Sequence, residues 1–528
     1  MQHSARTLPG THIQTICLDR PFSNFDFVEK FSGDCIALRR IFSQARRNDC
    51  RTLIIENVDG APDIVQENED LAQHPDVGSL LFSQTCRLSF FNLLFDGEGC
   101  PDSIVDDNFI GYAIVRKVRA TSGWTRIWIY ESVLHPERIT NNFINKPPTW
   151  NCCITGKKLT IQGYLYAQQN GKTNCCAHVA VRSAAASFCS EGDLLYRKIN
   201  SLVGGFTSGG LTNQQMVQIL EANGASCYVG NFDALQSSDP SFTVPFQKYI
   251  YGSIESGFPA IIFFGVGRQG EYHAIPVIGH TFNQDNWVPR AELGYFEIGK
   301  KIRYIPSESW LSMFICHDDN FGSNYCIPRH YLHTGNEEIC KTCKKNVDSI
   351  AHQACVCHVI GTMPNYIKIN PIEAEAIGAE YLFELKENLP NPSPWLTRLK
   401  HSADNNRLVL RPILITVKDY IRHLGTVRSW EGNSVNTDLL TAIRNNLSDD
   451  HVWLVELSVS ELFAANKRKV GEVLIRATIE HNPECLFKSF VIARLPGYFA
   501  LYNDESSHFA FVPSGIEDHI ELYGQEEV

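Results

Sequence analysis

The sequence has no excess of positive charge. Its 528 residues include 47 Lys and Arg against 58 Asp and Glu, a formal net charge of −11, and the pI is near 5.9. An acidic chain is poorly suited to holding nucleic acid or an anionic membrane surface. We therefore expect no nucleic acid and no membrane among its partners, and a peptide or small molecule fits better. No oligomeric state is predicted.

Long apolar runs are also missing. No segment approaches the roughly 18 consecutive apolar residues of a membrane-spanning helix, and the start of the chain has no basic segment followed by an apolar stretch. No internal repeat or low-complexity tract is present, and 44% hydrophobic with 20% charged residues is typical of globular chains. These features predict a soluble, cytoplasmic protein that folds along its whole length.

Cysteine, in contrast, is plentiful. The 18 cysteines are spread along the chain, whereas disulfide scaffolds concentrate them in short secreted domains. We therefore expect reduced thiols and, in one Cys-rich stretch, a metal site.

Turn-forming residues and composition divide the chain into four predicted units. The segment 145–149, with two prolines among polar residues, is typical of a boundary. We expect an N-terminal α/β domain at 1–148, a central domain at 149–335, a Cys-rich insertion at 336–362 and a C-terminal α/β domain at 363–528. Helical and alternating strand patterns occur in each large unit, so the predicted fold class is α+β.

Two predicted helices lie in the central domain. The stretch that begins CCAHVAVRSAAASF at Cys175 is rich in alanine and has no Gly or Pro, which favours a buried helix. Thr212 can cap a second helix with Gln215 at its third position, and Gly224 ends it. Short apolar strands are predicted at 260–264, 273–278 and 310–316, with polar residues at their ends.

These element ends carry the candidate catalytic residues. Cys176 opens the Ala-rich helix, where unpaired N–H groups and the helix dipole favour a thiolate. His273, at the start of an apolar strand, is the predicted base, and Asp318, at the end of the next clear strand, is predicted to orient it. Gln168 and Gln169 lie one loop upstream of Cys176, and Gln169 is the predicted donor to an oxyanion.

Each choice has a competitor. Cys175 is the alternative nucleophile, and His280, seven residues after His273, is the alternative base. Asp319 and Asn320 compete with Asp318, and all three are also typical turn residues.

The order of these features resembles the papain-like superfamily and, within it, the C39-like peptidases, over about residues 160–330. Cys176-Ala177-His178-Val179-Ala180 resembles the segment that carries the nucleophile in these peptidases. His273-Ala274, ahead of Val277-Ile278-Gly279, resembles the segment of their base, and Asp318 with Gly322 resembles the segment of their carboxylate. Ala177 stands where Gly is common, Asp319 stands where Pro is frequent, and Gln169 precedes Cys176 by one residue more than usual. This last departure keeps Cys175 as an alternative.

The resemblance implies a papain-like core at 149–335 and a cysteine peptidase or amidase that acts on a peptide or protein substrate through a Cys-His-Asp triad and a thioester. One alternative is acyl transfer to an amine, as in transglutaminase-like enzymes. Another is a catalytically inactive scaffold with the same fold.

A second group of residues suggests a structural metal. Cys340-Lys341-Thr342-Cys343 is spaced as a zinc knuckle, and Cys355-Val356-Cys357-His358 follows after a short loop. We predict a structural Zn²⁺ held by Cys340, Cys343 and Cys355, with Cys357, His358 or His352 as the fourth ligand. The alternative is a Lys-rich loop facing solvent.

Overall fold

The structure is a computed structural model, and its helices and strands are mixed along the chain, in agreement with the predicted α+β class. No helix in the part it describes is both long enough and apolar enough to cross a membrane. The described residues are 13–18, 28, 35–97, 99–136, 142–189, 193–206, 209–232, 244–265, 272–283, 288–294, 302–334, 355–390, 394–428, 431–447, 451–466, 468–480, 487–503, 508–514 and 520–523.

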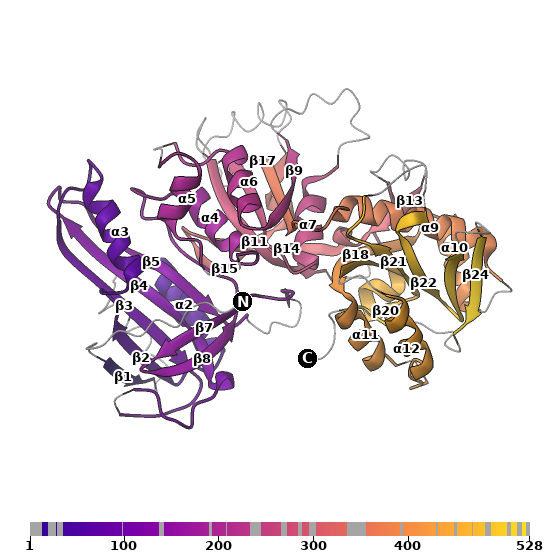
Figure 1. The fold of residues 1–528 in the computed structure, drawn as a ribbon, viewed down its shortest axis with the longest axis horizontal. Helices are drawn as coiled ribbons and strands as arrows, with labels where there is room; N and C mark the ends of the chain where they lie inside the picture. The colour runs from indigo at the N-terminus through magenta and orange to yellow at the C-terminus, as the bar shows by residue number, and fades with distance from the viewer. Residues whose placement is uncertain are drawn as a thin grey trace.

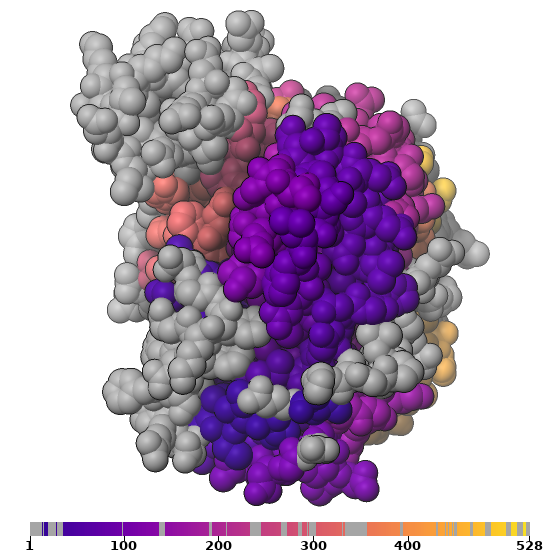
Figure 2. Space-filling view, turned by 90° about the vertical axis from the view of Figure 1, so that its left-hand side faces the viewer, coloured from indigo at the N-terminus to yellow at the C-terminus, as the bar shows by residue number. Residues whose placement is uncertain are grey.

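The N-terminal part is an antiparallel five-stranded sheet whose strands lie in sequence order. The strands are β1 (Ile13–Cys17), β2 (Thr52–Asn57), β3 (Leu80–Phe91), β4 (Phe109–Ala120) and β5 (Thr125–Leu134). The amphipathic helix α2 (Ile36–Arg47) buries one apolar side on this sheet. Helix α3 (Pro62–Gln73), the short η1 (Asp106–Asn108) and the hairpin of β7 (Thr149–Ile154) and β8 (Lys157–Gln162) complete this part, which fills most of one end of the molecule (Figure 2).

The central sheet has the strand order β15-β14-β11-β10-β17-β16, with β6 paired to β11 and β9 paired to β17. Its strands are β6 (Asn142–Phe143), β9 (Ala225–Asn231), β10 (Ala260–Gly265), β11 (Tyr272–Phe282), β14 (Leu311–Asp318), β15 (Gly322–Pro328), β16 (His333–Thr334) and β17 (Cys355–Pro364). All of its strand pairs are antiparallel except β16 with β17.

Helices cover both faces of the central sheet (Figure 1). On one face lie α4 (Cys176–Ala185), α5 (Tyr196–Leu202) and α6 (Asn213–Ala222), whose apolar residues share a core with Ile261 of β10 and Ala274 of β11. On the other face α7 (Phe246–Glu255) packs over Ile262 and Ile275. The alternation of side chains along β10 and β11 therefore builds two cores, one on each side.

The C-terminal sheet has the order β12-β13-β18-β19-β21-β22-β23-β24. Its strands are β12 (Glu292–Leu293), β13 (Arg303–Pro306), β18 (Leu408–Thr416), β19 (His451–Val459), β21 (Gly471–Arg476), β22 (Phe490–Leu495), β23 (Tyr498–Asn503) and β24 (His508–Pro513), and β20 (Arg468–Lys469) pairs separately with β25 (Ile520–Glu521). Its helices are α9 (Pro371–Asn388), α10 (Pro394–Asp404), α11 (Val417–Thr426) and α12 (Thr437–Asn446). Three further short helices within the described residues are η4 (Ser307–Trp310), η5 (Arg329–Tyr331) and η7 (Leu462–Asn466).

Strand pairing crosses the predicted domain boundaries. β6 lies before residue 148 but pairs with β11 of the central sheet. β17 begins inside the predicted insertion 336–362, yet it is an inner strand between β10 and β9. β13 lies within 149–335 but pairs with β18 of the C-terminal sheet. The central and C-terminal sheets are therefore each built from strands of more than one predicted unit, and no single linker separates them.

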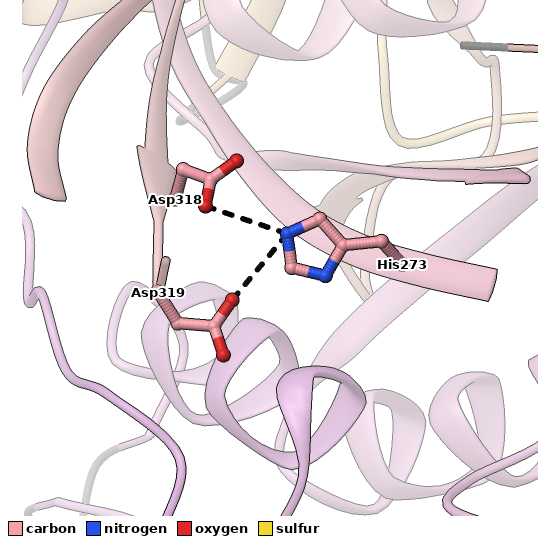
Figure 3. Close-up of side chains that lie close together, drawn as sticks. All are labelled: His273, Asp318 and Asp319. Carbon is pink, nitrogen blue, oxygen red and sulfur yellow. Dashed lines mark ion pairs between the residues drawn. The ribbon is translucent and has the colours of Figure 1, made fainter. Parts of the chain in front are cut away.

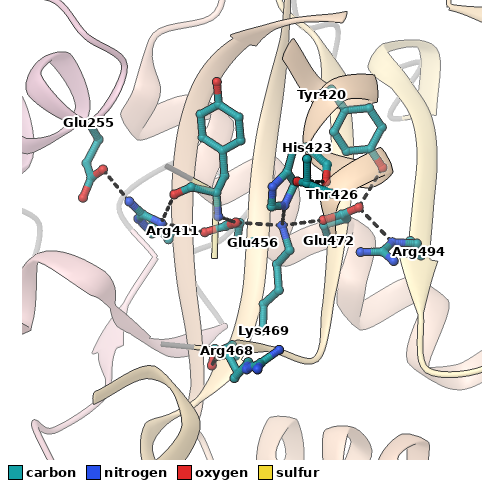
Figure 4. Close-up of polar contacts among 12 residues, drawn as sticks. Glu255, Arg411, Tyr420, His423, Thr426, Glu456, Arg468, Lys469, Glu472 and Arg494 are labelled. Atoms are coloured by element: carbon teal, nitrogen blue, oxygen red, sulfur yellow. Dashed lines mark hydrogen bonds and ion pairs between the residues drawn. The ribbon is translucent and has the colours of Figure 1, made fainter. Parts of the chain in front are cut away.

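A row of buried charged side chains joins α7 to the C-terminal sheet (Figure 4). Its members alternate in sign along the row: Glu255, Arg411, Glu456, Lys469, Glu472 and Arg494. Each neighbouring pair lies 2.8 or 2.9 Å apart. Because burial penalises charge unless it is paired, such an alternating row keeps every charge compensated.

Candidate active site

Helix α4 begins at the two adjacent cysteines. Cys175 is the N-cap, with extended backbone, and Cys176 is the first helical residue. The alanines that follow let the helix lie close to the central sheet, and residues from Ala177 to Ala185 are buried. Because the two cysteines are the N-cap and the first helical residue, their sulfurs lie at the first turn of α4, whose unpaired N–H groups favour an anion.

The two thiols form one coupled acid–base pair. The hydrogen bond with Cys176, together with His178, lowers the pKa of Cys175 well below its ordinary value. The same hydrogen bond, and then burial, raise the pKa of Cys176. Because one site readily holds one negative charge and resists a second, these opposite shifts belong to the pair and favour a single negative charge shared by the two sulfurs.

Cys176 lies against strand β11. The backbone N–H of Ala274 donates to the Cys176 sulfur, and the charge of Asp319 also acts on this thiol. Ala274 directly follows His273, the predicted base. The structure therefore brings the start of α4 to the strand that carries the histidine, although the two are far apart in the sequence.

His273 faces two carboxylates. Its Nε2 lies 3.4 Å from Oδ1 of Asp318 and 3.4 Å from Oδ1 of Asp319, and 3.3 Å from Nδ2 of Asn320. Figure 3 shows both carboxylates on the side of Nε2, with Nδ1 turned away from them. All three predicted candidates for the orienting residue therefore meet the same ring nitrogen, and the imidazole and both carboxylates are buried.

These charges oppose the effect of burial on the imidazole. Burial alone disfavours the imidazolium, but the hydrogen bond with Asp318 and the charges of Asp319 and Asp318 outweigh it and raise the pKa of His273. Burial raises the pKa of Asp319 to about 6, against the opposing effect of His273. An imidazole whose charged form is stabilised by neighbouring carboxylates is a suitable counterpart for an activated thiol.

Asp318 also shapes the turn that carries it. Its Oδ1 accepts the backbone N–H of Asn320 at 2.8 Å and that of Phe321 at 3.2 Å. This side-chain turn closes the β14–β15 hairpin between Asp318 and Gly322. Asp318 thus has a structural role in addition to its contact with His273.

The two glutamines upstream have different surroundings. The Gln168 carboxamide accepts the N–H of Ile129 at 2.9 Å and donates to the carbonyl of Asp319 at 2.8 Å, so both of its ends are engaged. The Gln169 carboxamide interacts with the Asp319 carboxylate and lowers its pKa. Gln169, the predicted oxyanion donor, therefore lies at the same cluster as His273.

A second histidine, which the sequence analysis did not single out, contacts Cys175. Nδ1 of His178 lies 3.1 Å from the Cys175 sulfur, and its Nε2 lies 2.9 Å from Oδ1 of Asn200. Asn200 Nδ2 in turn donates to the carbonyl of Thr173 at 3.1 Å. The spacing Cys-x-x-His at a helix start would have indicated this contact, because N-cap and N3 side chains lie on one side of the first turn.

The remaining predicted residues lie elsewhere. His280, the alternative base, is fully buried, and its Nε2 lies 3.0 Å from Glu255, the first member of the row of buried charges. Cys340, Cys343 and His352 lie outside the described residues, as does the side chain of Cys355, although its backbone begins β17. Cys357 is buried in β17, and the ring of half-buried His358 meets Phe263 edge-on. The zinc site stays a prediction.

Within the described residues, one group of His, Cys, Asp or Glu side chains has the geometry of a metal site, and it is again His273, Asp318 and Asp319. Their ligand atoms lie within 4.8 Å of one another. One imidazole and two carboxylates could hold a divalent cation. Cys175 and Cys176 lie near the same imidazole, so His273 is also a candidate base for one of these thiols.

Comparison of the chain with protein-family models, with curated proteins and with solved structures finds no match.

Proposed function

We propose that this chain is a cysteine-dependent hydrolase, a peptidase or amidase with a papain-like core. The observation that carries the proposal is the position of His273. Its Nε2 faces Asp318 and Asp319, while the next residue along β11 donates its N–H to the Cys176 sulfur. A helix that starts at a thiol and packs on an antiparallel sheet bearing the base and its acid is also the arrangement that the resemblance implies.

In the proposed reaction the Cys176 thiolate attacks an amide carbonyl carbon. The carbonyl oxygen takes the negative charge, and the N–H of Cys176 and the Gln169 carboxamide stabilise it. The His273 imidazolium then gives its proton to the amine nitrogen as the C–N bond breaks, which leaves a thioester. Water, deprotonated by His273, attacks the thioester, releases the acid and restores the thiol pair.

Cys175 is the second candidate for the nucleophile. Its sulfur lies 3.1 Å from Nδ1 of His178, whose Nε2 meets Asn200, so it has a histidine and an amide of its own. The hydrogen bond with Cys176, together with His178, also lowers the pKa of Cys175. We favour Cys176 because Cys175 also caps α4, interacting with the backbone N–H of His178, and because Cys176 lies against the strand of His273.

The test is brief treatment of the purified protein with a near-stoichiometric dose of iodoacetamide, read by intact mass and peptide mapping. We expect one rapidly labelled site, lost in Cys176→Ala and slowed at least about tenfold in His273→Ala, which removes the base. His280→Ala is the control histidine, and it should leave the labelling rate unchanged. Rapid labelling that is lost in Cys175→Ala instead would make Cys175 the nucleophile.

Slow labelling spread over many cysteines, unchanged by any of these substitutions, would contradict the hydrolase and favour an inactive scaffold. Hydrolysis and acyl transfer are separated by product. A peptide-amide library incubated with the enzyme yields free acids in the first case, and amine adducts when a primary amine is added in the second.

A further inference from the structure

Helix α2 of the N-terminal sheet lies directly on the hairpin that carries Asp318 and Asp319. Arg40 Nε donates to the carbonyl of Ser323 at 2.6 Å, and its Nη2 donates to the carbonyl of Asn324. Gln44 Nε2 donates to the same Ser323 carbonyl at 2.6 Å, and Ser323 Oγ donates back to Gln44 Oε1 at 2.9 Å. Two side chains one helical turn apart thus bind consecutive backbone groups of β15.

Gly322 makes this close approach possible. Its φ is +114°, and a Cβ at this position would lie 2.7 Å from Cδ of Arg40. Any other residue would therefore strain the backbone and push away the arginine stem. Gly322 pairs with Asp318 across the hairpin, so the arginine lies against the turn that holds the carboxylates.

Aromatic rings extend the contact. The Arg40 guanidinium lies 5.5 Å from the ring centroid of Tyr325, and Tyr325 stacks on the exposed ring of Phe321 at 5.2 Å. Phe321 and Asp319 belong to the same turn. The guanidinium therefore binds the hairpin through backbone oxygens and through a cation–π contact.

A second link from the N-terminal sheet reaches the same turn. Gln168 hydrogen-bonds to the backbone N–H of Ile129 in β5 and to the backbone carbonyl of Asp319. The hairpin is thus held by side chains of α2 and, through Gln168, by the backbone of β5.

We propose that Arg40 and Gln44 are positioning residues, which hold the β14–β15 hairpin so that Asp318 and Asp319 meet His273. This inference rests on the proposed function. It makes the N-terminal sheet a part of the catalytic unit. Neither residue touches the reacting atoms, and both act through the placement of the carboxylates.

The test uses the full chain with the substitutions Arg40→Met and Gln44→Met. Methionine keeps much of each aliphatic stem but cannot donate to the Ser323 carbonyl. Arg46→Met is the matched control, because Arg46 is exposed on the same helix. Arg40→Lys keeps the charge and loses the forked donor, so it separates geometry from charge. The readouts are the pH profile of iodoacetamide labelling at the activated thiol and the thermal midpoint.

We expect Arg40→Met and Gln44→Met to slow labelling near neutral pH by about tenfold, the usual cost of losing a group that orients a functional side chain. The shape of the pH profile should change as well, because Asp318 and Asp319 would no longer be held 3.4 Å from Nε2 of His273. Arg40→Lys should resemble Arg40→Met, and Arg46→Met should resemble the wild type.

A profile identical to wild type in folded Arg40→Met and Gln44→Met overturns the positioning role alone. If Arg40→Met does not fold, Gln44→Met and Arg40→Lys decide the question by the same readouts. Absence of a rapidly labelled thiol in the wild type contradicts the proposed function itself, so the two failures are distinguishable.

Discussion

The Glu255 carboxylate of α7 and the Arg411 guanidinium of β18 form an ion pair of 2.9 Å from which solvent is excluded. Arg411 and His280, each in contact with Glu255, lower the pKa of Glu255 to about 2 despite its burial. Glu255→Gln would leave Arg411 with one carboxylate partner fewer. We expect it to lower the free energy of unfolding by roughly 3–5 kcal/mol, the usual cost of breaking a buried pair from one side.

Urea unfolding checks this prediction. Glu461→Gln is the matched control, since Glu461 pairs with Arg398 at 3.1 Å on the surface. Exposed pairs contribute about 0–1 kcal/mol, so this control should unfold almost as the wild type does. Equal midpoints for Glu255→Gln and Glu461→Gln would mean that the buried row does not join α7 to the C-terminal sheet energetically.

Asp318 is predicted to tolerate Asn better than Ala. An Asn Oδ1 can accept both the turn N–H groups and the Nε2–H of His273, as in Cys-His-Asn enzymes. We expect Asp318→Asn to keep thiol labelling within about threefold of wild type, and Asp318→Ala to slow it at least about tenfold. Removing the charge should also lower the pKa of His273. Asp319→Asn is measured beside these variants to compare the two carboxylates. If Asp318→Ala is labelled as fast as the wild type, Asp319 and not Asp318 is the residue that orients the His273 ring.

Cys175→Ser should separate capping from nucleophilic attack. Serine is a favoured N-cap residue and can still donate to His178, so α4 should keep its start. The hydrogen bond with Cys175 is the main cause of the raised pKa of Cys176, followed by burial and by the charge of Cys175. Because serine removes the Cys175 sulfur, we expect the pKa of Cys176 to fall in the variant. Labelling of Cys176 should then increase at mildly acidic pH. Complete loss of rapid labelling in Cys175→Ser would point to Cys175 as the attacking sulfur.

Low pH should destabilise the β14–β15 hairpin because His317 becomes protonated. Its Nε2 donates to the carbonyl of Tyr164 and its Nδ1 accepts the N–H of Asn324, both at 3.2 Å, so the buried ring fits only when neutral. Burial lowers the pKa of His317 to about 4 from 6.5. The folded state therefore binds fewer protons than the unfolded state between these values, and stability is lost as pH falls through that window.

This loss amounts to roughly 3 kcal/mol for a shift of this size. Urea unfolding of His317→Gln from pH 7 to pH 4 checks it, because Gln can make both hydrogen bonds without titrating. The variant should lose less stability on acidification than the wild type, while the exposed His135→Gln should behave as the wild type. Parallel pH curves for His317→Gln and wild type would show that His317 is not the acid-sensitive group.

The predicted zinc site is open to a direct measurement. Native mass spectrometry and elemental analysis should find one Zn²⁺ per chain, and the double substitution Cys340→Ser with Cys343→Ser should remove it. Because four protein ligands leave no position for water, we expect its loss to reduce stability more than thiol reactivity. Zinc-free wild-type protein purified without chelators would favour the solvent-facing loop.

Local patterns predicted the elements that position the site. The Ala-rich helix begins at Cys176, as expected from residues without Gly or Pro. Thr212 accepts the N–H of Gln215 and its own N–H is bound by the Gln215 side chain, as the capping pattern indicated. Strands β10 and β11 were found by their apolar runs. These elements are determined by residues that are close together in the sequence, so their patterns can be recognised in a single sequence.

Contacts between distant segments could not be predicted in the same way. Nothing local relates Arg40 and Gln44 to Ser323, which lies 283 and 279 residues further along the chain. His178 was noted only as part of the helix, because its contact with Asn200 depends on how α5 packs. The Cys-rich stretch concealed β17, whose apolar residues Val356, Val359 and Ile360 are buried.

The place of β17 has a consequence for how the protein is made. This strand lies between β10 and β9, both of which precede it in the chain. While a nascent chain emerges from the ribosome, the backbone edges of β9 and β10 stay unpaired until residues 355–364 arrive, and exposed strand edges favour aggregation. A fragment ending before Cys355 would contain Cys176, His273 and Asp318, but it would lack the strand that closes their sheet.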